Sequence, residues 1–230
     1  MKFFNINKMV GALFVYAMLY CTSVSAGIVL GGSRIVYSAD ARQTSISVKN
    51  DSGSASYLIQ SWVEKEDGTR TTDFIITPPL YLSAPGNENI LRVIYAGAPH
   101  ASKNERLYYF NVKAVPSVDK TAIQNKNSVV VATTLKVKLF VRPAGLKPAR
   151  EQAENELVFT RKGSLLDIHN PTPYWLTLTG IKTGGRKLED VMISPQGRKS
   201  VSLPAGSGTT ISWNAINDYG GVKKGKGRIR

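Results

Sequence analysis

Cysteine is almost absent from this sequence, and its scarcity excludes a disulfide-stapled fold. The only cysteine, Cys21, lies in the N-terminal segment, so residues 27–230 contain none. Without disulfides, a chain of this kind has to be stabilised by burial of an apolar core alone. About 200 residues are enough for one large domain or for two domains of about 100 residues each.

Residues typical of catalytic and metal sites are scarce as well. The two histidines, His100 and His169, have no cysteine, Glu-x-x-His motif or other metal-ligand spacing around them. No nucleophile elbow and no glycine-rich phosphate loop occurs. We therefore expect no metal and no cofactor. A distant pair of carboxylates, as in a secreted glycan-active enzyme, stays open at this point, but the sequence indicates a binding protein rather than an enzyme.

Acidic residues are few compared with basic ones. The chain has 16 Asp and Glu against 30 Lys and Arg, with a net charge of +14. Such an excess favours nucleic acid, an anionic surface or an acidic protein as partner, but no RNA- or DNA-binding motif is present. For the basic C-terminal tail the simplest interpretation is a frayed, solubilising end; its charges are Lys223, Lys224, Lys226, Arg228 and Arg230.

Long apolar runs are absent after the first 26 residues, so we expect a protein that does not span a membrane. Lys2 and Lys8 form a basic region, and the apolar run 9–20 that follows is too short to cross a bilayer comfortably. Small residues precede and include Ala26, as at a signal-peptidase site. We expect residues 1–26 to be a cleaved signal peptide, with an uncleaved anchor as the alternative. Export also argues against a nucleic-acid partner.

One unusually long strand is predicted over residues 128–142. Its apolar residues alternate with a period of two, which is the pattern of a strand; they are Val129, Val131, Thr133, Leu135, Val137, Leu139 and Val141. Such a strand is equally consistent with the middle of an ordinary sandwich and with a strand that is lent to a partner. In the second case alternate side chains would fill pockets of the partner.

The rest of the chain consists of short alternating segments separated by turn residues, without a convincing amphipathic helix. Seven strands up to Arg142 predict an immunoglobulin-like sandwich, with residues 28–37 as its first strand and Trp62 as a core anchor. Six further segments between residues 157 and 213 predict a second, smaller β domain. The expected domains are 27–145 and 146–230.

Several motifs, in this order along the chain, resemble the periplasmic chaperones of the chaperone–usher pilus pathway, the PapD-like family. They are Gly32-Ser33-Arg34-Ile35-Val36-Tyr37, Thr77-Pro78-Pro79, Glu105-Arg106-Leu107-Tyr108-Tyr109-Phe110-Asn111, Lys136-Val137-Lys138-Leu139-Phe140-Val141-Arg142-Pro143, Asn170-Pro171-Thr172-Pro173-Tyr174, Ser194-Pro195 and Ile216-Asn217-Asp218-Tyr219-Gly220-Gly221. The resemblance implies an all-β chain of two immunoglobulin-like domains in a boomerang arrangement. It also implies a periplasmic chaperone that binds pilin subunits by donor-strand complementation and delivers them to an outer-membrane usher.

The resemblance further implies roles for particular residues. The donor strand would present Val129, Val131, Thr133 and Leu135 to the subunit, whose C-terminal carboxylate Arg34 and Lys138 would hold. An interdomain ionic network would consist of Glu105, Arg142 and Asp218. The usher would dock on Leu58, Gln60, Thr77, Pro78, Pro79, Leu80, Arg92 and Val115.

Two further expectations concern association and the alternative function. The apolar donor strand would favour self-association of the unbound protein, because an uncovered strand edge invites pairing. The alternative is that the chain is itself an exported pilin or adhesin. Pilins commonly have one domain, a disulfide and a characteristic terminal strand, and residues 27–230 have two expected domains and no cysteine.

Overall fold

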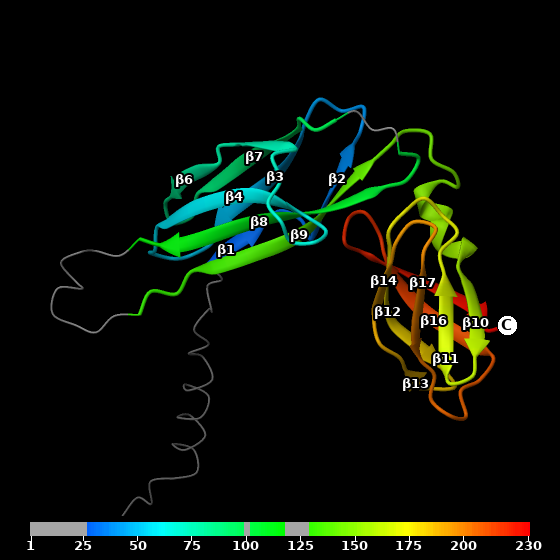
Figure 1. The fold of residues 1–230 in the computed structure, drawn as a ribbon. Helices are drawn as coiled ribbons and strands as arrows, with labels where there is room; N and C mark the ends of the chain where they lie inside the picture. Colours follow the sequence, from blue (N-terminus) through cyan, green and yellow to red (C-terminus); the bar gives the residue numbers. More distant parts are fainter. Residues whose placement is uncertain (1–26, 99–101, 118–128) are drawn as a thin grey trace, which may run out of the picture.

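The computed structural model describes residues 27–98, 102–117 and 129–230, so the predicted signal peptide lies outside the described residues. The described chain is nearly all β, and its helical content is the single 3-10 helix η1 (Arg150–Glu156). It forms two sandwiches that meet at one end and enclose an angle (Figure 1). The predicted fold class is confirmed; the boundary between residues 145 and 146 stays a prediction.

The first domain packs a four-stranded sheet against a five-stranded one. Its core lies between the sheets and includes Val48, Ile59, Leu91, Phe110 and Leu139, all fully buried. The four-stranded sheet has the order β1 (Ile28–Leu30), β3 (Thr44–Asn50), β7 (Glu88–Tyr95) and β5 (Phe74–Thr77). The five-stranded sheet has the order β2 (Arg34–Ser38), β9 (Thr133–Arg142), β8 (Arg106–Pro116), β4 (Tyr57–Lys65) and β6 (Leu80–Ser83).

The second domain has its own core, which includes Leu166, Ile168, Leu176, Leu178 and Ile181. One of its sheets has the order β10 (Val158–Lys162), β11 (Leu165–His169) and β15 (Arg198–Ser202). The other has the order β13 (Arg186–Lys187), β12 (Leu176–Thr183), β16 (Thr210–Ile216) and β17 (Val222–Arg228), with β14 (Val191–Ile193) also paired to β12. We call this second sheet the β12–β16 sheet.

The predicted first strand, residues 28–37, is in fact two strands in different sheets. β1 pairs with β3, whereas β2 pairs with β9, and residues 31–33 carry the chain across. A side chain at Gly31 would have its Cβ 2.2 Å from Oγ of Ser47. The close approach to β3 therefore favours glycine at position 31, and strand periodicity alone did not reveal the crossing.

The long strand also starts later than predicted, at Thr133 instead of residue 128. The ladder between β8 and β9 ends at the pair Ala114 and Thr133. The next residue of β8 whose N–H would point toward β9 is Pro116, because the N–H of Ser117 points the other way and donates to the carbonyl of Ser56. Proline has no N–H, so the pairing stops there, and residues 129–132 continue without a strand assignment.

Two smaller expectations were wrong. Trp62 is not a core anchor: it lies on the outer face of β4, where its Nε1 donates to Oε1 of Glu64 at 2.7 Å and the guanidinium of Arg70 covers its ring. The basic tail is not frayed, because β17 pairs with β16 along all of its seven residues. Gly225 makes this possible, since a Cβ there would lie 2.3 Å from the indole of Trp213.

Within the described ranges, no helix is long and apolar enough to cross a membrane. The isolated bridge between Phe159 and Ile229 ties the end of the chain to the sheet of β10. The last residues are thus part of the second sandwich.

Candidate functional site

The candidate site is centred on β9, whose two edges are covered to different extents. On one side β8 pairs with β9 from Thr133 to Val141, all but its last residue. On the other side β2 runs parallel to β9 and covers only Lys138–Arg142. Within the described residues, no strand pairs with this second edge between Thr133 and Val137. The fold therefore leaves half of a long strand with a free edge, which can accept another strand.

The side chains ahead of this free edge are apolar and uncovered. Val129 is 90% exposed and Val131 is 70% exposed. They share the parity of Leu139 and Val141, which point into the first core, but they lie beyond the last pair of the β8 ladder, where no sandwich remains to cover them. Of the other predicted donor residues, Thr133 is exposed and Leu135 is half-buried.

Arg34 and Lys138 lie directly opposite each other, at the point where the free edge ends. They are register partners in the parallel pair of β2 and β9 and lie on the outer face of the sheet. Nη1 of Arg34 donates to the carbonyl of Ile216 at 3.3 Å, and Nζ of Lys138 donates to Oγ1 of Thr177 at 3.2 Å. Both partners belong to the second domain, so the two cations lie between the domains.

The electrostatics of this cation pair favour an incoming anion. Burial lowers the pKa of Arg34 and of Lys138, and the charge of Arg34 lowers that of Lys138 further. Nε of Arg34 is buried and has no hydrogen-bond partner in the described chain. A carboxylate would relieve the repulsion between the cations and accept hydrogen bonds from both, with Arg34 able to bind it through two nitrogens.

Next to the cation pair, the predicted ionic network joins the two domains. Nε of Arg142 is 2.8 Å from Oε1 of Glu105, and its Nη1 and Nη2 bind the two carboxylate oxygens of Asp218 at 2.6 and 2.8 Å. Glu105 is only 3% exposed, and its Oε2 accepts the backbone N–H of Trp175 at 2.9 Å. The structure thus brings the three predicted residues together across the interface.

Burial and charge act differently on the two carboxyls of this network. Burial raises the pKa of Glu105 despite the neighbouring Arg142. Burial also acts to raise the pKa of Asp218, but the hydrogen bonds and charge of Arg142 outweigh it and the pKa is lowered. The pKa of Arg142 is raised by its two acidic partners, although burial opposes this. Asp218 therefore carries the negative charge that the network stabilises most.

Sequence reasoning missed Arg150, which extends the network into the second domain. Its Nε lies 3.6 Å from Oδ1 of Asp218, and its guanidinium lies over the ring of Tyr174 and forms a buried ion pair with Glu154. Its Nη2 also donates to the carbonyl of Ile216 at 3.4 Å, the acceptor that Arg34 uses. Arg150 lies in a polar connector, where no pattern distinguishes it from a solvated arginine.

Asp218→Asn is expected to make the free energy of unfolding depend less on pH in the acidic range. A carboxyl with a lowered folded-state pKa stabilises the folded chain above its ordinary pKa of 3.8 and loses this contribution as the pH falls through its folded-state value. Urea unfolding should therefore show the variant less stable at neutral pH, with a deficit that shrinks in acid. Asp40→Asn, which removes an exposed carboxyl without a salt bridge among the described residues, is the control. A deficit that stays constant with pH would contradict this assignment.

The residues predicted to form a docking patch fall into two groups. Leu58, Gln60 and Val115 lie on the outer faces of β4 and β8, and Leu80 lies opposite Gln60 on the edge strand β6. Leu82, which the sequence reasoning did not select, is 63% exposed beside Leu58. The second group lies at the end of β5 and on β7, where Thr77 pairs with Arg92; Pro78 and Pro79 connect β5 to β6.

Comparisons with known proteins match both domains. The N-terminal domain of PapD, described as a pili and flagellar-assembly chaperone, matches residues 27–147. The C-terminal domain of the pili assembly chaperone PapD matches residues 152–227. The probable fimbrial chaperone SfmC of Escherichia coli K12 is 39% identical over 212 residues, which are 91% of this chain and 92% of SfmC.

Solved structures of similar proteins have the same arrangement. The periplasmic chaperone SfaE is 37% identical, with a TM-score of 0.77 over 89% of this chain and 100% of that one. A chain from the complex of the Salmonella enterica SafA pilin with the SafB chaperone is 26% identical. Its TM-score is 0.79, over 90% of this chain and 98% of that one.

Proposed function

Because the chain belongs to the PapD family of pilus-assembly chaperones, we propose that it captures pilin subunits on the free edge of β9. It is a pilin-binding chaperone and not an enzyme, since the family consists of chaperones. The single observation that supports this mode of capture is the half-covered strand β9, with Arg34 and Lys138 at the end of its free edge.

The register of the added strand follows from this geometry. β2 blocks the edge from Lys138 onward, so a subunit strand can pair only with Thr133–Val137 and the residues before them. If its C-terminal carboxylate binds Arg34 and Lys138, its last residues run toward Lys138. The subunit strand is then parallel to β9. Main-chain hydrogen bonds supply affinity, and the carboxylate fixes the register.

The donor side chains act at the other end of the same strand. In the complex Val129, Val131, Thr133 and Leu135 fill successive positions in the core groove of a subunit that lacks its own last strand. Burying an aliphatic side chain of this size is worth about 1.5–3 kcal/mol. Val129 and Val131 are the two most exposed apolar side chains of this segment and contribute most. In the unbound chaperone they support self-association.

Delivery to an outer-membrane usher would use both groups of the predicted docking residues. Leu58, Gln60, Leu80 and Val115 lie on β4, β6 and β8. Thr77 and Arg92 lie on β5 and β7 of the other sheet, and Pro78 and Pro79 connect β5 to β6. The protein would act in the periplasm after cleavage of residues 1–26.

Capture is tested by mixing residues 27–230 with a denatured pilin subunit that lacks a last strand of its own. The expected result is a soluble 1:1 complex in size-exclusion chromatography. The same subunit truncated by one residue at its C-terminus, which displaces the carboxylate from the cation pair, is the control and should be captured much less. Equal capture of both forms would overturn the carboxylate anchor. A subunit that aggregates equally with and without the chain would overturn the proposed capture.

A further inference from the structure

The outer face of the β12–β16 sheet carries a row of lysines that no function above has used. In this row Lys187 of β13 pairs with Lys182 of β12, Lys182 pairs with Ser212 of β16, and Ser212 pairs with Lys226 of β17. Lys224 lies one row further, opposite Asn214. All four lysines are exposed, and we call them the lysine face. Direct cross-strand partners point to the same side of a sheet, so the lysines of β12, β13 and β17 gather on one face, with Ser212 and Asn214 of β16 between them.

A bulge in β12 turns Lys182 onto this face. The pairing with β16 shifts between Thr179 and Lys182, and Gly180 adopts a φ of 56°. Oδ1 of Asp190 accepts the N–H of Gly180 at 2.8 Å and holds the bulge. The bulge adds one residue to the alternation, so that Ile181 points into the core and Lys182 points outward. Such bulges are known to re-aim side chains.

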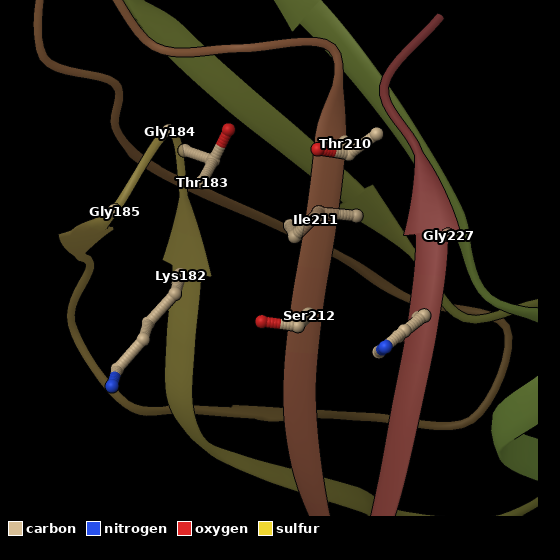
Figure 2. A pocket seen from close by; sticks show the side chains of 9 residues that line it. Lys182, Thr183, Gly184, Gly185, Thr210, Ile211, Ser212 and Gly227 are labelled. Carbon is tan, nitrogen blue, oxygen red and sulfur yellow. The ribbon is translucent and has the colours of Figure 1, made fainter.

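The lysine face is hollowed and lacks acidic partners. Two adjoining grooves of about 490 and 560 Å³ share Lys182, Ser212 and Lys226 as lining residues. Figure 2 shows Lys182 and Ser212 next to each other on neighbouring strands. None of the four lysines forms a salt bridge within the described part of the chain, whereas Lys162, Arg198 and Lys223 elsewhere in this domain do. The lysine face therefore presents four positive charges without an ion-pair partner among the described residues.

The same face of this sheet borders the proposed capture site. Thr177, whose hydroxyl accepts the hydrogen bond from Lys138, lies on the outward parity of β12 between buried Leu176 and Leu178. Lys182 follows Thr177 by five residues, which is roughly 15 Å along a strand. A pilin domain of about 100 residues has a radius of gyration of about 13 Å. It can therefore touch Lys138 and the lysine face at the same time.

We propose that the lysine face is a second contact surface for the captured subunit and that it selects subunits with a cluster of carboxylates on the facing surface. The inference rests on the proposed function and adds a preference among subunits to it. The strand addition at β9 depends mainly on the backbone and on the C-terminal carboxylate, which all subunits share. Complementary charge at a distance speeds encounter and excludes mismatched partners.

The test compares a Lys182→Gln, Lys226→Gln double variant with the control Arg42→Gln, Lys199→Gln. The control removes two exposed cations without salt bridges among the described residues, one from each domain and neither on this face. The probe is one purified acidic pilin subunit that the unmodified chain captures. The Lys182→Gln, Lys226→Gln variant loses two exposed ion pairs with the subunit. At low salt it should therefore associate with the subunit roughly 2- to 30-fold more slowly than the control variant. This difference should vanish near 1 M NaCl, where the Debye length is about 3 Å.

A second measurement locates the contact. Carbodiimide treatment of the unmodified complex joins a lysine amine to a subunit carboxylate with loss of water, when the two lie in contact. Amides at Lys182, Lys187, Lys224 or Lys226, with none at Lys199, support the proposal. Equal association rates of the Lys182→Gln, Lys226→Gln variant and the control variant would overturn the proposal. Amides only at residues outside the lysine face would overturn it as well. A subunit that the unmodified chain does not capture would instead overturn the proposed function.

Discussion

Lys138→Ala and Arg34→Ala are each expected to abolish subunit capture while the free chain keeps its fold. Each removes one of two partly buried cations that face each other across β2 and β9. Losing one partner of a desolvated charge pair costs about 2–5 kcal/mol, which is about 30-fold or more in affinity. The measurement is the dissociation constant for a pilin subunit, with thermal unfolding of the free variants as the test of the fold.

The control for this prediction is Lys113→Ala. Lys113 lies on the outer face of β8 and opposite Thr134, away from the cation pair, and forms no salt bridge among the described residues. Its removal should leave capture unchanged. Arg34→Lys should bind the subunit with an affinity between that of the unmodified chain and that of Arg34→Ala, because lysine keeps the charge but lacks the planar guanidinium that binds a carboxylate through two nitrogens. Normal capture by Lys138→Ala and Arg34→Ala would show that the carboxylate binds elsewhere.

Replacing Val129 and Val131 together by glutamate is expected to eliminate both subunit capture and self-association. These side chains are 90% and 70% exposed in the free chain and are buried only when a partner covers them. At about 1.5–3 kcal/mol for each buried aliphatic side chain, the loss of affinity is about 100-fold or more. Sedimentation should show a monomer at concentrations where the unmodified chain associates.

Ala132→Glu is the matched control, because residue 132 lies in the same unpaired segment with the opposite parity. It adds a charge to the other side of the segment, which does not enter the groove in the proposed complex. Capture should persist in this variant. If the double glutamate variant still binds subunits, the donor strand is placed in another register and begins nearer to Thr133.

Much of the fold could be predicted because β-strands leave a local pattern in the sequence. The alternation around Leu139 and Val141 indicated which side chains form the core, and both are buried. The prediction that Trp62 is a core anchor was wrong because it used the residue type alone. Alternate residues of β4 point to opposite faces of the sheet, and Trp62 falls among those that point outward.

The extent of pairing could not be predicted from a single strand. The late start of β9 depends on Pro116, which lies on the neighbouring strand, and the regular order of the tail depends on β16 as a partner for β17. A segment that is charged and rich in glycine shows no strand preference of its own. It becomes a strand here because Trp213 can lie against Gly225 and because the edge of β16 is available.

Most residues of the candidate site could be predicted from the sequence, but several of their contacts could not. The order of the family motifs pointed to Arg34, Lys138, Glu105, Arg142 and Asp218, but it did not show that Arg150 shares Asp218 or that Thr177 holds Lys138. Those contacts join residues that are distant in the chain: Arg150 and Asp218 are 68 positions apart. No local pattern predicts these contacts, because one arises only when the second sandwich is assembled and the other only when the two domains pack against each other.

The sequence by itself determined the all-β class, the two sandwiches, the apolar segment around Val129 and Val131, and the two cations of the proposed capture site. These depend on side-chain alternation and on motifs that lie within a few residues of one another. Only the tertiary structure decided which half of β9 keeps a free edge, how the domains are joined through Arg142, and that four lysines from β12, β13 and β17 share one face. Strand pairing, register and bulges decide these features, and they result from the mutual packing of segments distant in the chain.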